Sequence, residues 1–221
     1  MASTFFGLHI GSSALSSFQV ATNTTANNIA NVKTTGYTRQ AATLQAKDAI
    51  NVTARYGSVG TGVTVTSIKQ QRDLYYDNKY WENNSCYGRY EQKLYYMEQI
   101  QNYFKDNGSS VKGFSSVFSQ MFSDLDTLRS KPSDKTVRNQ FISSAQSLCT
   151  YFNQMSDNLS KLQDDCNEEI RNNVDKINSI SEKISLLNKE INQIETGTGV
   201  EASSLRDERA NLIDSLSKIV N

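Results

Sequence analysis

The side chains that could do chemistry in this sequence are one histidine, three cysteines and some adjacent carboxylates. A histidine binds a metal or acts as a general base when thiols, carboxylates or other imidazoles accompany it at suitable spacing. His9 stands in an uncharged leader, and the first carboxylate and the first thiol that follow it are Asp48 and Cys86. We therefore expect His9 to be a surface or interface residue, without a metal or a catalytic partner.

The positions of the thiols and of the paired carboxylates are those expected of residues on helix surfaces. Cys86, Cys149 and Cys166 are odd in number, widely spaced and without a Cys-x-x-Cys pair, which predicts free thiols on helices. The pairs Asp164-Asp165 and Glu168-Glu169 lie in a strongly periodic segment, where a solvated outer face accounts for them. No catalytic, metal or cofactor site is predicted, and we expect no enzyme.

Two further patterns resemble ligand sites without meeting their requirements. The glycines at 57, 60 and 62 lack a following Lys-Ser/Thr and a helix directly after them, so they do not form a phosphate loop. The tyrosines between Tyr75 and Tyr103 could stack nucleic-acid bases, but no basic stripe runs between them. Their spacing predicts the core and rim of a helical bundle.

The charge balance and the hydropathy exclude several classes of partner. The 23 Lys and Arg residues equal the 23 Asp and Glu residues, whereas a dedicated nucleic-acid binder carries a basic excess. No apolar run is long enough for a transmembrane helix, and the N-terminus lacks the features of a cleaved signal peptide. We expect no nucleic acid, no membrane insertion and, if the protein is exported, a route without such a peptide.

The leader itself predicts an unusual helix over residues 4–32. No charged residue precedes Lys33, and the other side chains are mostly Ser, Thr, Ala and Asn. Residues at alternating spacings of three and four form the seam expected of packed parallel helices: Leu8, Gly11, Leu15, Phe18, Thr22, Thr25, Ile29 and Val32. The apolar area is too small for this helix to fold alone, so we expect it to be ordered only beside other chains or a second terminal helix.

An extended region should follow this helix. Gly36 provides a helix stop, since glycine tolerates positive φ. From Gln40 to Ile68, short runs of β-branched residues stand on either side of a glycine-rich stretch, which predicts one or two hairpin-like pieces.

After Arg72 the pattern is helical. We predict helices over 72–106, 111–129 and 134–195, and a last helix that starts at a capping box, Ser204 to Asp207. Apolar residues repeat about every 3.5 residues along the longest helix, as in a coiled coil: Met155, Leu159, Leu162, Cys166, Ile170, Val174, Ile177, Ile180, Ile184, Leu187, Ile191 and Ile194.

The expected fold is therefore mainly α, with three parts. Residues 1–35 form an N-terminal assembly helix, residues 36–71 an extended linker with short β pieces, and residues 72–221 an elongated helical bundle with a long coiled-coil-like helix. One alternative reads the long seam as intermolecular, which would make the chain a dimerising binding or regulatory protein.

A motif at the end of the leader resembles a known family. The run from Ala26 to Arg39 reads Ala-Asn-Asn-Ile-Ala-Asn-Val-Lys-Thr-Thr-Gly-Tyr-Thr-Arg. It meets every defined position of the pattern Ala-Asn-Asn-(Leu/Ile)-Ala-Asn-x-x-Thr-x-Gly-(Tyr/Phe) of the flagellar rod, hook and hook-associated axial proteins. The Thr-Arg-Gln that follows Tyr37, and the later pieces 60–65, 72–77, 89–91 and 205–209, are most similar to hook-associated members.

The resemblance implies a structural subunit of the extracellular bacterial flagellum at the junction of hook and filament, or alternatively a hook or rod subunit. It implies contacts with copies of itself, the hook protein, the next hook-associated junction protein and an export chaperone. Family members are longer, so we expect this chain to be the N-terminal portion of such a protein. The residues expected to mediate assembly are Asn27, Asn28, Ile29, Asn31, Thr35, Gly36, Tyr37, Arg39 and Gln40.

Overall fold

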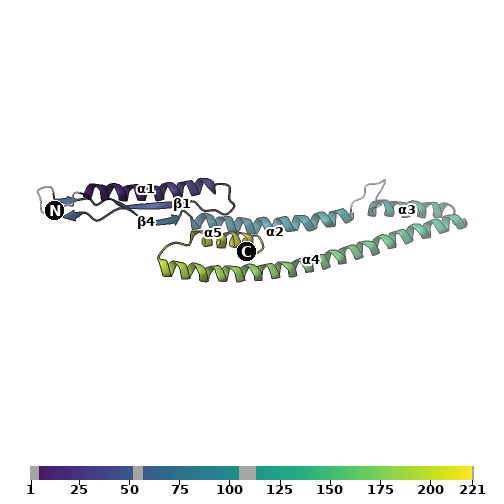
Figure 1. Ribbon diagram of the computed structural model, residues 1–221. Coiled ribbons are helices and arrows are strands. Elements are labelled where there is room, and N and C mark those ends of the chain that lie inside the picture. Colours follow the sequence, from purple (N-terminus) through teal and green to yellow (C-terminus); the bar gives the residue numbers. More distant parts are fainter. Residues whose placement is uncertain (1–4, 52–56, 105–112, 221) are drawn as a thin grey trace. The chain divides into compact units, whose positions relative to one another are not determined.

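The computed structural model describes residues 5–51, 57–104 and 113–220 (Figure 1). Within these ranges the chain forms five helices, with two short antiparallel strand pairs between the first and second helices. The mainly α fold class is confirmed. The elements in chain order are α1 (Phe6–Ala30), β1 (Gln40–Ala46), β2 (Ile50–Asn51), β3 (Ser58–Val59), β4 (Val63–Gln70), α2 (Leu74–Phe104), α3 (Phe114–Ser130), α4 (Lys135–Thr198) and α5 (Ser203–Ser217).

The chain groups into two compact units, Met1–Ser85 with Ile177–Asn221, and Cys86–Lys176. The first unit is discontinuous, because the second is inserted within it. This grouping differs from the division at residues 35 and 71, which follows composition along the chain and stays a prediction.

In the first unit, α1 packs along the hairpin formed by β1 and β4 (Figure 1). Small side chains make the approach close: Ser17 is 5% exposed, and its hydroxyl donates a 3.1 Å hydrogen bond to the carbonyl of Val63. A Cβ on Gly62, where φ is +106°, would lie 2.2 Å from Oγ of Ser13. The hairpin of its own chain thus covers one side of α1, a neighbour that the sequence did not predict, and the dependence of the helix on other chains stays a prediction.

The hairpin lies in the region that the sequence predicts to be extended. Gln40 of β1 pairs with Gln70 of β4, and the antiparallel register shifts between Thr43 and Leu44. The extended region is confirmed, but β1 itself contains few β-branched residues and was not singled out by the sequence. The part of this region at residues 52–56 lies outside the described residues.

The first unit is completed by the start of α2, the end of α4 and α5. The indole N–H of Trp81 donates to Oδ1 of Asp214 at 2.7 Å, which joins α2 to α5. Ile180, Leu187 and Ile191 of α4 are buried within the chain, together with Ala210 of α5. This part of the coiled-coil seam is therefore occupied intramolecularly, against the alternative of a dimeric zipper.

The start of α5 corrects the predicted capping box. Its N-cap is Ala202, and no side chain bonds to that end as a cap. Glu195, from the preceding helix, instead accepts from the backbone N–H of Ala202 at 3.1 Å and from both Nε and an Nη of Arg206 at 2.7 Å. Arg206 also pairs with Glu201 at 2.9 Å, so the turn between α4 and α5 is closed by ion pairs.

The second unit contains the end of α2, α3 and the first part of α4. Glu169 accepts hydrogen bonds from Gln92, at 2.6 Å, and from the hydroxyl of Tyr96, and this acceptor raises the pKa of Tyr96. Asp134 caps the start of α4, because its Oδ1 accepts from the backbone N–H of Thr136 at 2.8 Å.

Of the core and rim of a bundle predicted for the tyrosines of α2, the core is wrong, because none of these side chains is buried. No described residue of α2 is buried, and a row of large side chains is exposed. The exposed tyrosines are Tyr75, Tyr76, Tyr80, Tyr87, Tyr90 and Tyr95. Hydrogen bonds join α2 to the other helices through Trp81 and Asn84 in the first unit, and through Gln92 and Tyr96 in the second.

Candidate functional site

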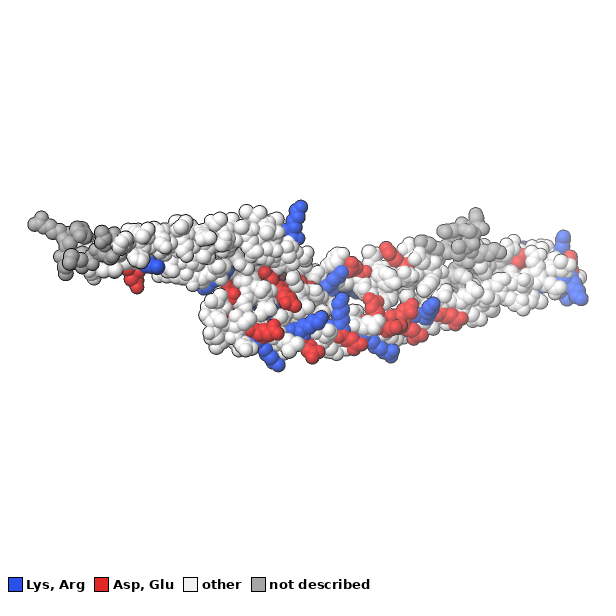
Figure 2. All heavy atoms as spheres, viewed as in Figure 1, with Lys and Arg blue, Asp and Glu red and all other residues white. Residues whose placement is uncertain are grey.

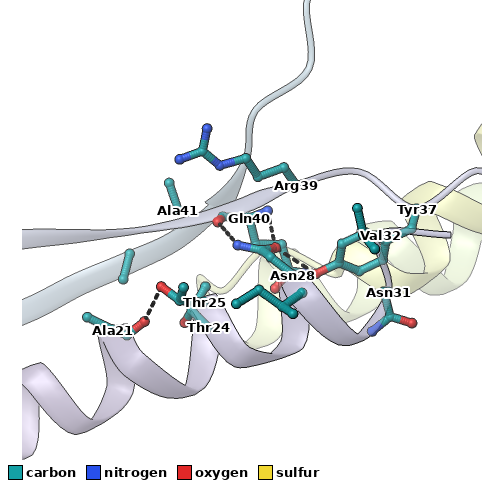
Figure 3. A pocket seen from close by; sticks show the side chains of 12 residues that line it. Ala21, Thr24, Thr25, Asn28, Asn31, Val32, Tyr37, Arg39, Gln40 and Ala41 are labelled. Atoms are coloured by element: carbon teal, nitrogen blue, oxygen red, sulfur yellow. Dashed lines mark hydrogen bonds between the residues drawn. The ribbon is translucent and has the colours of Figure 1, made fainter. Parts of the chain in front are cut away.

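The candidate site is the region where α1 ends and the chain turns back into β1. Asn28, on the last turn of α1, bonds to the backbone of Gln40 twice (Figure 3). Its Nδ2 donates to the Gln40 carbonyl at 2.8 Å, and its Oδ1 accepts from the Gln40 N–H at 2.9 Å. One amide side chain therefore satisfies both backbone groups of the first strand residue, as a neighbouring strand would.

Tyr37 and two more asparagines complete this hydrogen-bonded cluster. The Tyr37 hydroxyl donates to Oδ1 of Asn28 at 2.8 Å and accepts from Nδ2 of Asn27 at 3.2 Å. Nδ2 of Asn31 donates to the carbonyl of Asn27 at 3.0 Å and to its Oδ1 at 2.9 Å, which links the two side chains at the helix end. Burial first, and the negative charge of Asp207 second, raise the pKa of Tyr37.

Gly36 makes the reversal between helix and strand possible for two reasons. Its φ of +75° lies in the left-handed region, as the sequence predicts. A Cβ at this position would also lie 1.7 Å from Oδ1 of Asn211, because α5 packs directly against the turn.

Asp207 of α5 joins this turn to the base of the hairpin. It is 9% exposed, and it accepts from the backbone N–H of Thr38 at 3.3 Å and from Nε2 of Gln70 at 2.8 Å. Glu201 accepts in addition from the backbone N–H of Gln70 at 3.3 Å. The strand ends on both sides of the hairpin are thus held by carboxylates from a distant part of the chain.

Beside these contacts lies a cavity of about 590 Å³, which we call the α1–β1 pocket. It is lined by Ala21, Thr24, Thr25, Asn28, Ile29, Asn31 and Val32 on the helix side, and by Tyr37, Arg39, Gln40, Ala41 and Ala42 on the strand side. Figure 3 shows the guanidinium of Arg39 pointing away from α1 at the edge of this pocket.

The nine predicted residues divide into two sets. Five come together in the hydrogen-bonded cluster: Asn27, Asn28, Asn31, Tyr37 and Gln40. Gly36 forms the turn next to them, whereas Ile29, Thr35 and Arg39 are exposed, with Ile29 and Arg39 in the lining of the α1–β1 pocket. Their role in assembly stays a prediction.

Asp207 and Asn211 are the residues that sequence reasoning missed. In the sequence, residues 205–209 resemble the family, and the pattern around Asp207 predicts a helix cap. The sequence contained no local signal for them, because Asp207 lies on the same side of its helix as Asn211 and Asp214, a polar pattern typical of a solvated face.

The histidine and the three cysteines lie on helices, outside the hydrogen-bonded cluster. His9 is exposed on α1, and the three cysteines are free thiols on α2 and α4. The described residues contain no group of His, Cys, Asp and Glu side chains that could hold a metal ion. Within the same residues, none of the helices combines the length and the apolar character that crossing a bilayer requires.

Comparison with known proteins agrees with the motif. Residues 97–221 match the model of the flagellar hook-associated protein FlgK helical domain, and residues 8–38 match that of the flagella basal body rod protein. The chain is 34% identical to flagellar hook-associated protein 1 of Bacillus subtilis, over 100% of this chain and 44% of that protein. It is 33% identical to the protein of the same name from Salmonella typhimurium, over 94% of this chain and 37% of that protein.

The chain thus spans less than half the length of the curated relatives that it matches. The helical-domain model alone covers more than half of the chain. From this match and the motif of α1, the chain belongs to the family of the flagellar hook-associated protein FlgK.

Proposed function

We propose that the chain serves in a structural subunit of the bacterial flagellum, at the junction between hook and filament, and acts by packing rather than catalysis. The names of its relatives and the match to the rod-protein model support this role. The partners are copies of itself, the hook protein and the next hook-associated junction protein. The subunit is extracellular, and it leaves the cell with an export chaperone's help and without a cleaved signal peptide.

The observation that carries this proposal is that one face of α1 is buried by its own chain and another face is exposed to solvent. The small polar face, with Ser17 and Thr24, is buried against the hairpin. The predicted seam on another face is open to solvent, where Leu15 is 72% exposed and Ile29 is 69% exposed. Burying a side chain of this kind contributes about 1.5–3 kcal/mol, so a row of them favours packing against other helices.

The predicted assembly residues have two roles. Asn28, Gly36, Tyr37 and Gln40 hold the turn that sets the direction of the hairpin relative to α1. The exposed residues Ile29, Thr35 and Arg39 supply contacts with neighbouring subunits.

The test is Leu15→Asp in the full-length protein, expressed in cells that lack the wild-type copy. We expect loss of filament growth, because a carboxylate in a packed seam is left without a partner. The stability of the isolated protein should change by less than about 0.5 kcal/mol, since Leu15 touches solvent in the single chain.

Asn23→Asp is the matched control, because Asn23 is exposed on α1 but lies off the seam. Filaments should grow normally in this variant. Normal filament growth in Leu15→Asp would reject the packing role of α1.

A further inference from the structure

Carboxylates from a distant segment hold α1 and its hairpin to the rest of the first unit. We call α1 with β1 and β4, residues 6–46 and 63–70, the α1–hairpin module. The sequence of this module contains no Asp or Glu, and the surface over α1 is almost free of charge in Figure 2. The acceptors for the N–H groups at the base of the hairpin are Asp207 of α5 and Glu201 of the turn before it.

Asp207 is a buried carboxylate held by neutral donors. It is 9% exposed, and its oxygens accept from the N–H of Thr38 and from Nε2 of Gln70. Among the residues that the structure describes, it has no ion pair with a Lys or Arg. Taking a carboxylate out of water is unfavourable, and here only neutral groups replace the water. Release of Asp207 into solvent recovers its hydration, which offsets part of the lost hydrogen bonding.

The interface around these bonds is incompletely filled. A cavity of about 340 Å³ lies between β4 and the turn from α4 to α5. Val200, the large apolar residue of that turn, is 60% exposed. Atoms that line a cavity lose dispersion contacts, so the hydrogen bonds to Asp207 and Glu201 contribute most of the attraction between the two sides. The cavity is lined by Thr66, Ser67, Ile68 and Lys69 on the strand, and by Glu195, Gly199, Val200, Glu201 and Arg206 on the turn and its flanking helices.

The α1–hairpin module has internal contacts of its own. Ser17 of α1 is buried and donates to the carbonyl of Val63, and Asn28 bonds twice to the backbone of Gln40. The two strands pair from Gln40 with Gln70 to Ala46 with Val63. None of these contacts involves α4 or α5, so all of them can persist when the module separates from α5.

We propose that the α1–hairpin module docks against α5 as one rigid piece, through a reversible polar joint formed by Asp207 and Glu201 with Thr38 and Gln70. When the joint opens, these bonds break together while α1 stays packed on its hairpin. Such local opening requires less free energy than unfolding of the whole unit.

Asp207 is thereby a positioning residue for assembly. Only the closed joint fixes the direction of the exposed α1 seam relative to α5, and neighbouring copies meet the seam in that direction. This step rests on the proposed function, whereas the opening of the joint is a property of the single chain.

The test of the joint is amide-resolved hydrogen exchange of the isolated full-length protein. Glu201→Ala should speed exchange of the Thr38 N–H at least about tenfold, although Glu201 does not bond to Thr38, because the joint opens as a unit. Asp207→Asn should speed exchange of the Gln70 N–H, which bonds to Glu201, by a similar factor. Amides inside the β1–β4 ladder should stay within about twofold of wild type, since the module does not unfold.

Glu208→Gln is the matched control, because Glu208 is exposed on α5 and the substitution removes the same charge one residue from Asp207. Exchange of Thr38 and Gln70 should stay within about twofold of wild type. In cells without the wild-type copy, the double variant Asp207→Asn/Glu201→Ala should lower the number of assembled junctions at least about tenfold, because the docked form becomes the minor one.

Three results would overturn the proposal. Exchange could rise only at the amide that lost its own acceptor, which shows that the joint is not one unit. Ladder amides could rise equally, which shows that the module unfolds rather than undocks. The double variant could assemble like wild type, which removes the positioning role. Normal assembly of Leu15→Asp would instead reject the packing role of α1 and leave the exchange results unaffected, since these depend on no other chain.

Discussion

At the scale of single residues, one amide side chain joins the first helix to the strand that follows it. Asn28 both donates to and accepts from the backbone of Gln40, and the Tyr37 hydroxyl shares its acceptor oxygen. Replacement by Asp would keep the acceptor and remove the donor, so an asparagine is needed for both bonds. Of the repeated asparagines in the motif, Asn28 thus bonds to the strand backbone, while the side chains of Asn27 and Asn31 bond to Tyr37 and to each other.

Gly36→Ala should destabilise the first unit strongly. Left-handed backbone costs an alanine about 1–2 kcal/mol, and the new Cβ also collides with the side chain of Asn211, for a total of about 3 kcal/mol or more. Urea unfolding measures this loss.

Gly57→Ala separates the two causes. Gly57 has a φ of +73°, close to that of Gly36, but nothing lies within 4 Å of its missing Cβ. It should show the backbone cost alone. Equal losses in the two variants would show that the contact with Asn211 is unimportant, whereas Asn211→Ala in the Gly36→Ala background should recover stability.

Sequence predicts the residues of this turn better than it predicts their partners. Gly36 follows from its freedom at positive φ, and the asparagines follow from their place at a helix end. Asp207 and Asn211 could not be paired with them, because local patterns contain no information about contacts across most of the chain. The capping-box interpretation of Asp207 shows that a local rule can be satisfied by a residue whose side chain bonds elsewhere.

At the scale of elements, periodicity locates each helix within a few residues but does not reveal what covers its faces. The seam of α1 and the period of α4 were both visible in the sequence. Of the corresponding side chains, Leu187 and Ile191 are buried by their own chain, while Leu8 and Val32 are exposed. The interpretation of the tyrosines of α2 was wrong for the same reason. The spacing of residues along one helix face is identical whether that face packs against another helix or is exposed to water.

The turn between α4 and α5 predicts how stability depends on pH. The guanidinium of Arg206 and the N–H of Ala202 lower the pKa of Glu195 from 4.5 to about 2. A carboxylate with a depressed pKa in the folded state stabilises above its unfolded pKa. That contribution is therefore complete above pH 4.5 and is lost as the pH falls toward 2.

Glu195→Gln should lower the free energy of unfolding at pH 7, and its stability should approach that of wild type near pH 2. Thermal unfolding across this range measures the difference. Glu190→Gln is the control on the same helix, because Glu190 is exposed and has no ion pair among the described residues. A wild-type curve parallel to that of Glu195→Gln between pH 4.5 and 2 would contradict the ion pair.

At the scale of the whole molecule, the first unit depends on both segments of a discontinuous fold. Trp81 is the only tryptophan, and its indole donates to Asp214 of α5. Its fluorescence therefore reports the joining of α2 to α5 in the first unit, whereas helical circular dichroism reports helices of both units.

Asp214→Ala should leave the indole N–H without its partner and destabilise the first unit by about 1 kcal/mol. The midpoint of denaturant unfolding followed by Trp81 fluorescence should move to lower concentration. Asp126→Ala, at an exposed position of α3 in the second unit, should leave that midpoint in place. An unchanged fluorescence midpoint in Asp214→Ala would show that α5 does not stabilise the surroundings of Trp81.

The bond between Thr38 and Asp207 has a consequence for the order of events during synthesis. Asp207 leaves the ribosome 169 residues after Thr38, which at 5–20 residues per second is a delay of about 10–30 s. Throughout that interval the nascent N-terminal turn has no α5 to close upon, and its asparagines and backbone groups are open to any other molecule that reaches them first.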